Sequence, residues 1–181
     1  MDCHTSLSSL AMTVNNMKKT TFSFNKENLA KAEAIVKKYP EGRQRSAVLP
    51  LLDMAQRQNG GWLSVDVIEY VANMLDMPYI RAYEVASFYT MFNLKPVGKH
   101  HIQICGTTPC WLRGAEDIKN ACEKTLKIKC NETTKDGLFT LSEVECLGAC
   151  INAPVVQIND DYYEDLTPTS MNDVIKKLKS T

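Results

Sequence analysis

The sequence lacks any apolar run that could cross a membrane, and it lacks net charge. A spanning helix needs about 18 or more consecutive apolar residues, and the longest candidates, Ala47 to Met54 and Val65 to Leu75, are interrupted by acidic side chains. Lys+Arg and Asp+Glu both number 21, so the formal net charge is +0. We therefore expect no direct membrane insertion and no binding to nucleic acid, which needs an excess of basic charge.

Targeting signals and a disulfide framework are also absent from the pattern. The stretch from Met1 to Lys19 contains no arginine and no basic segment followed by an apolar one, so neither a mitochondrial presequence nor a secretory signal is expected. Seven cysteines is an odd number, and they are unevenly spaced. A reducing, cytoplasmic setting is the expectation. Residues 1–19, with Cys3 and His4, are expected to form a flexible tail without a role in the site.

Several chemical motifs are missing as well. The sequence has no G-x-G-x-x-G and no phosphate-binding loop, so nothing indicates that this chain binds a nucleotide cofactor unaided. It has no C-x-x-C pair, which disfavours both thioredoxin-type thiol chemistry and a zinc knuckle.

What the sequence does have is two close cysteine pairs in its second half. Cys105 and Cys110 form C-x4-C, and Cys146 and Cys150 form C-x3-C. A two-iron cluster takes two thiolates on each iron, and these loops suit it better than a single tetrahedral zinc ion, which stays the alternative. The pattern predicts one [2Fe-2S] cluster bound by these four residues.

The other two cysteines of this half, Cys122 and Cys130, are expected to be small buried side chains and are spare candidates for a ligand. Small residues surround the pairs: Gly106, Gly114, Gly148 and Ala149. They either let backbone amides approach the sulfurs, which would raise the reduction potential, or merely permit turns.

Residues 20–96 are predicted to form a small helical bundle. Four helices are expected, capped or opened at Asn25, Ser46, Ser64 and Pro78. Their inward faces are expected to be Leu29, Ala32, Ile35, Val36 and Tyr39; Val48, Leu51, Leu52 and Ala55; and Val67, Ile68, Val71, Met74 and Leu75. The fourth, Pro78 to Phe92, carries five aromatic residues, which serve either as core or as a surface for docking a partner subunit.

Residues 97–181 are predicted to form an α/β layer, with the boundary at Lys95 to Gly98. The expected strands are His101 to Ile104, Phe139 to Val144, and a hairpin of Pro154 to Ile158 with Tyr162 and Tyr163. The expected helices run from about Trp111 to Glu123 and from Ser170 to Leu178. Both cysteine pairs then follow strand ends, where loops can bring them to one rim.

Charged and imidazole side chains near the pairs have a second interpretation. His100 and His101 invite comparison with a cluster that uses two histidines, but adjacent residues of a strand point to opposite faces, so a surface or interface role is expected. Arg113 and Lys119 are expected at solvated positions.

Three segments together carry a specific resemblance that runs from about residue 20 to 181. They are YPEGRQRSAVLPLLDMAQRQNGGWLS, RAYEVASFYTMFNLKPVGKHHIQICGTTPCWLRG and LSEVECLGACINAPVVQINDDYYEDLT. The sequence resembles the family of 24 kDa subunits of NADH:quinone oxidoreductase (respiratory complex I). The resemblance implies a thioredoxin-like [2Fe-2S] ferredoxin domain preceded by a helical bundle, with ligands at Cys105, Cys110, Cys146 and Cys150.

The same resemblance implies a function and partners. The cluster would exchange electrons with FMN on an NADH-oxidising flavoprotein subunit, beside other peripheral-arm subunits, and the isolated chain would not oxidise NADH. The expected location is the cytoplasmic side of a bacterial inner membrane, peripheral through the complex, with the mitochondrial matrix side as the alternative. The other hypotheses are a subunit of an NAD-linked hydrogenase or formate dehydrogenase, a free-standing ferredoxin, and a zinc-stabilised module.

Overall fold

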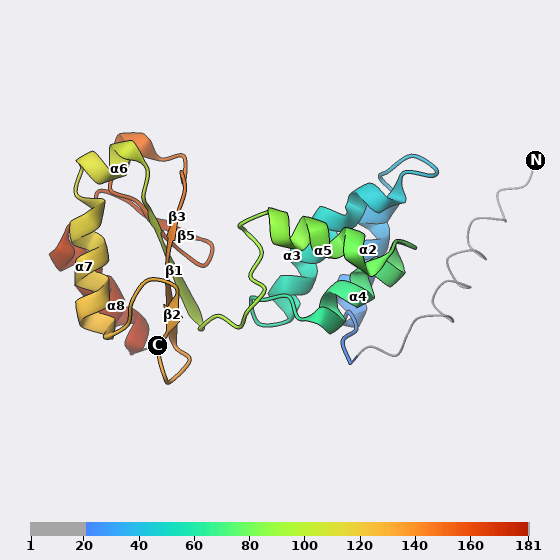
Figure 1. Ribbon diagram of the computed structural model, residues 1–181, viewed down its shortest axis with the longest axis horizontal. Helices are drawn as coiled ribbons and strands as arrows, with labels where there is room; N and C mark the ends of the chain where they lie inside the picture. Colours follow the sequence, from blue (N-terminus) through green and yellow to red (C-terminus); the bar gives the residue numbers. More distant parts are fainter. Residues whose placement is uncertain (1–20, 181) are drawn as a thin grey trace, which may run out of the picture. The chain divides into compact units, whose positions relative to one another are not determined.

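The computed structural model describes residues 21–180, and its contacts divide the chain into two compact units, one up to Pro96 and one from Val97 onward (Figure 1). Each unit has a separate hydrophobic core. The expected flexible tail, residues 1–19, lies outside the described residues. No helix among residues 21–180 is long and apolar enough to cross a membrane.

The first unit is helical. Its elements are α2 (Lys26–Val36), the 3-10 helix η1 (Gln44–Ala47), α3 (Val48–Gln58), α4 (Val65–Met74) and α5 (Tyr79–Phe88). Two predicted helix starts are confirmed, because Asn25 accepts a hydrogen bond from the Asn28 amide at 2.8 Å and Ser64 accepts one from the Val67 amide at 3.3 Å.

Three details of the predicted helices are wrong. Ser46 lies inside η1 and does not cap α3, which follows Ala47 directly without a side-chain cap. Leu29 is 37% exposed, so it does not belong to the inward face of α2. The fourth helix ends at Phe88 instead of Phe92, and only Phe92 of its five aromatic residues is buried.

The side chain of Gln56 is a buried polar group that the periodicity did not reveal. It lies on α3, where its Nε2 donates to the Met91 carbonyl at 3.0 Å and its Oε1 accepts from the Asn93 amide at 2.7 Å. The segment after α5 is neither helix nor strand, so its backbone groups need partners elsewhere. The two bonds from Gln56 supply partners and hold the segment against α3.

The second unit is a mixed sheet with helices, as predicted. Its elements are β1 (His100–Cys105), α6 (Thr108–Leu112), α7 (Ala115–Leu126), β2 (Glu132–Thr133), β3 (Phe139–Val144), η2 (Cys150–Asn152), β4 (Val156–Ile158), β5 (Asp161–Tyr163) and α8 (Pro168–Lys179). The strand order is β2-β3-β1-β4-β5, with β1 and β3 parallel and the other pairs antiparallel. Figure 1 shows α7 and α8 side by side along the sheet.

The hairpin of β4 and β5 and the strand β3 are confirmed, whereas the predicted helix from Trp111 to Glu123 is two helices. The break falls at Gly114, whose φ of 96° lies in the left-handed region that glycine adopts without steric cost. The two-residue strand β2 was not predicted, because its length gives no periodic signal. The last helix starts at Pro168, behind a capping box of Thr167 and Ser170.

Candidate iron–sulfur site

The parallel pairing of β1 with β3 brings the two cysteine loops to one end of the sheet. Cys105 is the last residue of β1 and lies opposite Val144, the last residue of β3. Cys146 follows two residues later, and the chain from there to Cys150 forms the second loop. Cys110 lies in α6, one short loop beyond β1. The carboxyl ends of neighbouring parallel strands share an edge, so the register places the loops together.

The four thiols form two pairs that differ in exposure. Cys105 and Cys110 are each 1% exposed and hydrogen-bond to one another, while Cys146 and Cys150 are exposed and form the second hydrogen-bonded pair. Electrostatic interactions also link Cys150 with Cys105 and with Cys110. Across the described residues, no three His, Cys, Asp or Glu side chains converge on a point where they could share one metal ion.

Hydrogen-bond donors surround the sulfurs. The Thr107 hydroxyl lies 3.3 Å from the Cys105 Sγ, which also accepts from the backbone amides of Leu147 and Thr107. The Val155 amide serves Cys110, and the Gly148 amide donates to the Cys146 Sγ at 3.3 Å. Such donors stabilise negative charge on sulfur, which is what a thiolate ligand of a cluster requires.

These surroundings shift the thiols in different directions. Burial raises the pKa of the Cys105 thiol, but the hydrogen bonds from Thr107 and the Leu147 amide outweigh burial, and the net pKa is lowered. Burial raises the pKa of Cys110, as does its hydrogen bond with Cys105. The pKa of Cys150 is raised mainly by its hydrogen bond with Cys146. The hydrogen bonds from Thr107 and Leu147 thus favour the thiolate form of Cys105, which is the form that binds iron.

Two glycines of the loops have specific backbone or packing roles. Gly148 has a φ of 81°, and its amide is the one that donates to Cys146. At Gly106 a β-carbon would lie 2.5 Å from the Glu143 Oε1. Gly148 therefore supports the hypothesis that small residues let amides reach the sulfurs, whereas Gly106 makes room for a neighbouring side chain.

Two side chains outside the loops fasten them. Arg113 donates from Nε to the Ala153 carbonyl at 3.2 Å, although most of its side chain is exposed as expected. Tyr162 donates from its hydroxyl to the Leu147 carbonyl at 2.8 Å. No sequence pattern indicated the Tyr162 contact, because it joins a residue of strand β5 to a residue of the second cysteine loop.

Lys119 and the two histidines are less exposed than predicted. The Lys119 side chain is only 22% exposed and lies between Glu116 at 2.7 Å and Glu143 at 3.3 Å, so the solvated position is wrong. His100 is buried at 8% exposure with its ring 5.3 Å from that of Phe139, so a surface role is wrong for it. His101 is half-buried, with Nε2 2.9 Å from the Ser142 hydroxyl.

Cys122 packs in the core, as expected, whereas Cys130 is not fully buried and only packs against the core. Cys122 is fully buried on α7, where burial raises the pKa of its thiol to about 12. Cys130 is half-buried, and burial raises its pKa as well. Neither thiol takes part in the two hydrogen-bonded pairs, since no interaction described above for those pairs involves Cys122 or Cys130.

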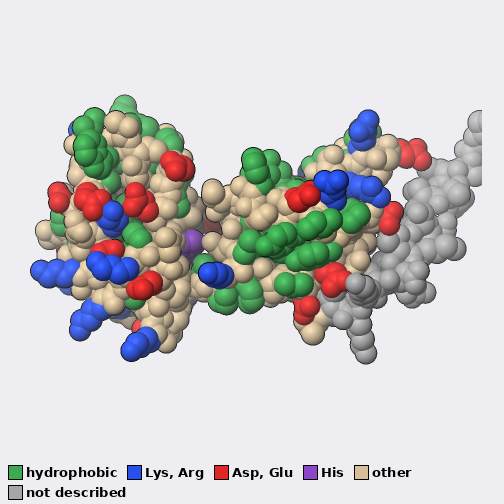
Figure 2. All heavy atoms as spheres, viewed as in Figure 1, with side chains coloured by type: hydrophobic (Ala, Val, Ile, Leu, Met, Phe, Trp, Pro, Cys, Tyr) green, Lys and Arg blue, Asp and Glu red, His purple; other side chains and the backbone are tan. Residues whose placement is uncertain are grey.

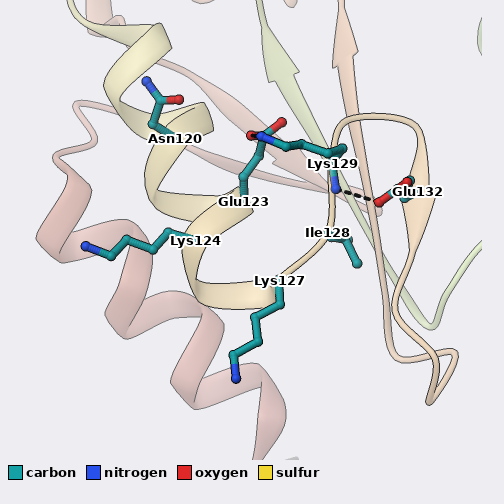
Figure 3. A pocket seen from close by; sticks show the side chains of 7 residues that line it. All are labelled: Asn120, Glu123, Lys124, Lys127, Ile128, Lys129 and Glu132. Carbon is teal, nitrogen blue, oxygen red and sulfur yellow. Dashed lines mark hydrogen bonds and ion pairs between the residues drawn. The ribbon is translucent and has the colours of Figure 1, made fainter.

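A pocket of about 400 Å³ in the same unit contains none of the cysteines (Figure 3). Lysines of α7 and of the loop after it line it, and the Lys129 amide donates to the Glu132 Oε2 at 2.7 Å. Because no thiol lines the pocket, the cysteine loops are the better candidate for redox chemistry.

Comparison with known proteins decides between the hypotheses that the thiol geometry leaves open. The model of the thioredoxin-like [2Fe-2S] ferredoxin family matches residues 32–179. The chain belongs to this family. It is also 70% identical to the E subunit of the NADH-quinone oxidoreductase of Rickettsia bellii, over 91% of this chain and 99% of that one. The resemblance to this family of complex I subunits is therefore confirmed.

A more distant relative agrees with this placement. The chain is 51% identical to "NADH dehydrogenase [ubiquinone] flavoprotein 2, mitochondrial" of Dictyostelium discoideum, over 93% of this chain and 68% of that one. A crystal structure of an air-oxidized NAD+-reducing [NiFe]-hydrogenase matches with a TM-score of 0.64 at 20% identity, covering 72% of this chain and 23% of the other. At that identity the hydrogenase match shows a shared fold only.

Proposed function

We propose that Cys105, Cys110, Cys146 and Cys150 bind one [2Fe-2S] cluster, and that the chain is the electron-transferring iron–sulfur subunit of an NADH-quinone oxidoreductase. The observation that carries the proposal is the meeting of two thiol pairs, supplied with amide donors, in a chain of this family. When bound, such a cluster takes up and releases one electron at a time.

The donor set suits the cluster in three respects. It offers four thiols in two pairs, which matches two irons with two protein ligands each. Its amides point at sulfurs whose charge grows on reduction. One pair is buried and the other exposed, so the site combines shielding from water with access for a redox partner.

As a subunit of a larger complex, the chain needs partner subunits, and we propose the NADH- and FMN-binding flavoprotein as the one that exchanges electrons with it. Exposed apolar side chains lie at the cysteine end of the sheet, at Trp111, Leu112 and Ile151, which are 63%, 70% and 90% exposed. They flank Cys110 and Cys150 in the chain. Burying such side chains against a partner would bring a donor or acceptor close to the cluster while excluding water.

The helical unit offers a second apolar surface, the α5 patch, defined as Ile80, Tyr83, Phe88, Tyr89 and Met91. Figure 2 shows hydrophobic side chains gathered on this unit in the region where Figure 1 has α5. The aromatic residues of this stretch thus differ in position: Phe92 belongs to the core, while Phe88 is 77% exposed. We propose that the patch docks the flavoprotein and other peripheral-arm subunits, and that residues 20–96 act as the docking domain and 97–181 as the cluster domain.

The site contains no nucleotide-binding loop, and we propose that NADH and FMN bind the partner, so that the isolated chain does not oxidise NADH. We place the complex at a membrane, with this subunit peripheral on the cytoplasmic side of a bacterial inner membrane; the matrix side of the mitochondrial inner membrane is the alternative. The alternatives of a free-standing ferredoxin, a hydrogenase or formate dehydrogenase subunit and a zinc module have no specific observation in their favour beyond the shared hydrogenase fold.

The test of the cluster is anaerobic purification of the full chain, followed by assays of iron and acid-labile sulfide and by EPR spectroscopy before and after dithionite. We expect about two irons and two sulfides per chain and an EPR signal only after reduction. Each of Cys105→Ala, Cys110→Ala, Cys146→Ala and Cys150→Ala should lose or alter the signal, and Cys122→Ala, the matched control, should keep it. Zinc without iron, or a signal indifferent to the four substitutions, would overturn the proposal.

The test of docking is co-purification with the flavoprotein subunit. Phe88→Glu and Met91→Glu should weaken the association by about tenfold or more, because a charge would be buried at the interface. Val65→Glu, at an exposed apolar position outside the α5 patch, is the control. Equal binding by all three variants would show that the patch is not the docking surface.

A further inference from the structure

The peptide unit between Leu147 and Gly148 is held at both ends. Its carbonyl accepts a hydrogen bond from the Tyr162 hydroxyl at 2.8 Å, and its N–H donates to the Cys146 Sγ at 3.3 Å. In a trans peptide the carbonyl and the N–H point in opposite directions. A group that fixes the carbonyl therefore also fixes where the N–H points.

Tyr162 is well placed to act as this fixed group. It lies on the edge strand β5 and pairs with Gln157 of β4, so its backbone is part of the sheet. The loop that it holds has weak constraints of its own, because Gly148, at a φ of 81°, is the residue type that changes backbone conformation most readily. The rigid element thus orients a peptide that the loop alone would leave free to rotate.

From this geometry we propose that Tyr162 is a positioning residue that sets the reduction potential of the cluster by aiming the Gly148 N–H at the Cys146 sulfur. The inference rests on the proposed [2Fe-2S] site. Reduction adds negative charge that the sulfurs share, and an N–H directed at a sulfur stabilises the reduced form more than the oxidised one. Rotation of the peptide would turn a carbonyl oxygen toward the sulfur and have the opposite effect.

The decisive variant is Tyr162→Phe, which removes the hydroxyl and keeps the ring. The full chain carrying it is loaded anaerobically, and its midpoint potential is measured by an EPR-monitored redox titration. We expect a more negative potential. At the midpoint of the native chain, the ratio of reduced to oxidised cluster should fall about threefold to tenfold, or about 30 to 60 mV at 59 mV per tenfold for one electron.

A second variant perturbs the Leu147–Gly148 peptide at the residue that carries its N–H. Gly148→Ala adds a β-carbon that meets nothing within 4 Å, so its effect is confined to the strain of a positive φ. It should shift the potential in the same direction, and the double variant should shift it by less than the sum, because both changes act on one peptide. Tyr163→Phe removes the neighbouring hydroxyl of β5 and should leave the potential unchanged.

The outcomes separate this inference from the function on which it rests. A native chain that binds no iron and sulfide overturns both. If the native chain binds its cluster and the loaded fraction of Tyr162→Phe has the native potential, only the role of Tyr162 is overturned. If Tyr162→Phe loads poorly, the potential of its loaded fraction and that of Gly148→Ala still decide, since a purely structural role would lower cluster content without moving either potential.

Discussion

The carboxylate of Glu143 fills the space beside Gly106 into which a side chain would project. A β-carbon on Gly106 would lie 2.5 Å from the Glu143 Oε1 and 3.0 Å from its Cγ. Glu143 is in turn held by Lys119, whose Nζ lies 3.3 Å from Oε2. Gly106 directly follows Cys105, so the absence of a side chain there lets the first cysteine loop lie against the Lys119–Glu143 pair of α7 and β3.

Gly106→Ala should lower the midpoint of thermal unfolding by about 2 to 4 °C, which corresponds to about 1 kcal/mol for a chain of this size. The cause is the forced displacement of Glu143 from its place beside Lys119. Circular dichroism on the full chain measures it. Adding Glu143→Ala should recover part of the loss, because the truncated side chain leaves room for the methyl group. Strict additivity of the two changes would contradict this account.

His100 should make stability depend on pH. Burial, followed by the charge of Lys99, lowers the pKa of His100 below its ordinary value, and its Nε2 has no hydrogen-bond partner within residues 21–180. The unfolded chain then binds the proton more readily, so stability is fully present above about pH 6.5 and is lost as the pH falls through the lowered pKa.

His100→Phe is the matching experiment, with unfolding midpoints measured from about pH 7.5 to about pH 5, a range that brackets the ordinary pKa of histidine. The variant should lose less stability over that range than the native chain. Comparing the two chains cancels the carboxylates and His101, whose pKa burial also lowers. Parallel pH profiles would show that His100 is not the group responsible.

Cys122 should resist alkylation in the folded chain. At about pH 8 a thiol with a pKa of about 12 is ionised only to about one part in ten thousand, and Cys122 is also fully buried. Iodoacetamide labelling of the native protein, read by mass spectrometry, should modify the half-buried Cys130 before Cys122. In urea the two should react at similar rates. Equal labelling of both in the folded state would mean that α7 opens readily.

Gln56→Leu should destabilise the helical unit by about 2 to 3 kcal/mol, since it leaves the Asn93 amide and the Met91 carbonyl without their partner. A drop of about 4 to 8 °C or more in the unfolding midpoint is expected. Glu33→Leu, an exposed position on α2, is the control and should change the midpoint little. A similar small effect for both would show that water replaces the lost bonds.

Local patterns predicted the elements that have strong local signals. Asn25 and Ser64 cap helices because their side-chain oxygens reach an amide three residues on, and this depends on sequence neighbours alone. The strand Phe139–Val144 and the hairpin turn at Asn159, which has a φ of 55°, were predicted for the same reason. The predicted cap at Ser46 is wrong, because the 3-10 helix η1 joins directly to α3 and leaves no exposed helix start to cap.

The sequence by itself determined that two close thiol pairs exist and that each follows a strand, because spacing and periodicity are properties of the chain. Only the tertiary structure decided that the pairs differ in burial, that Lys119 and His100 are mostly covered, and that the Tyr162 hydroxyl bonds to the Leu147 carbonyl. These features depend on the register of parallel strands and on contacts between residues far apart in the chain. No local pattern encodes such contacts, since they are selected by the packing of the whole unit.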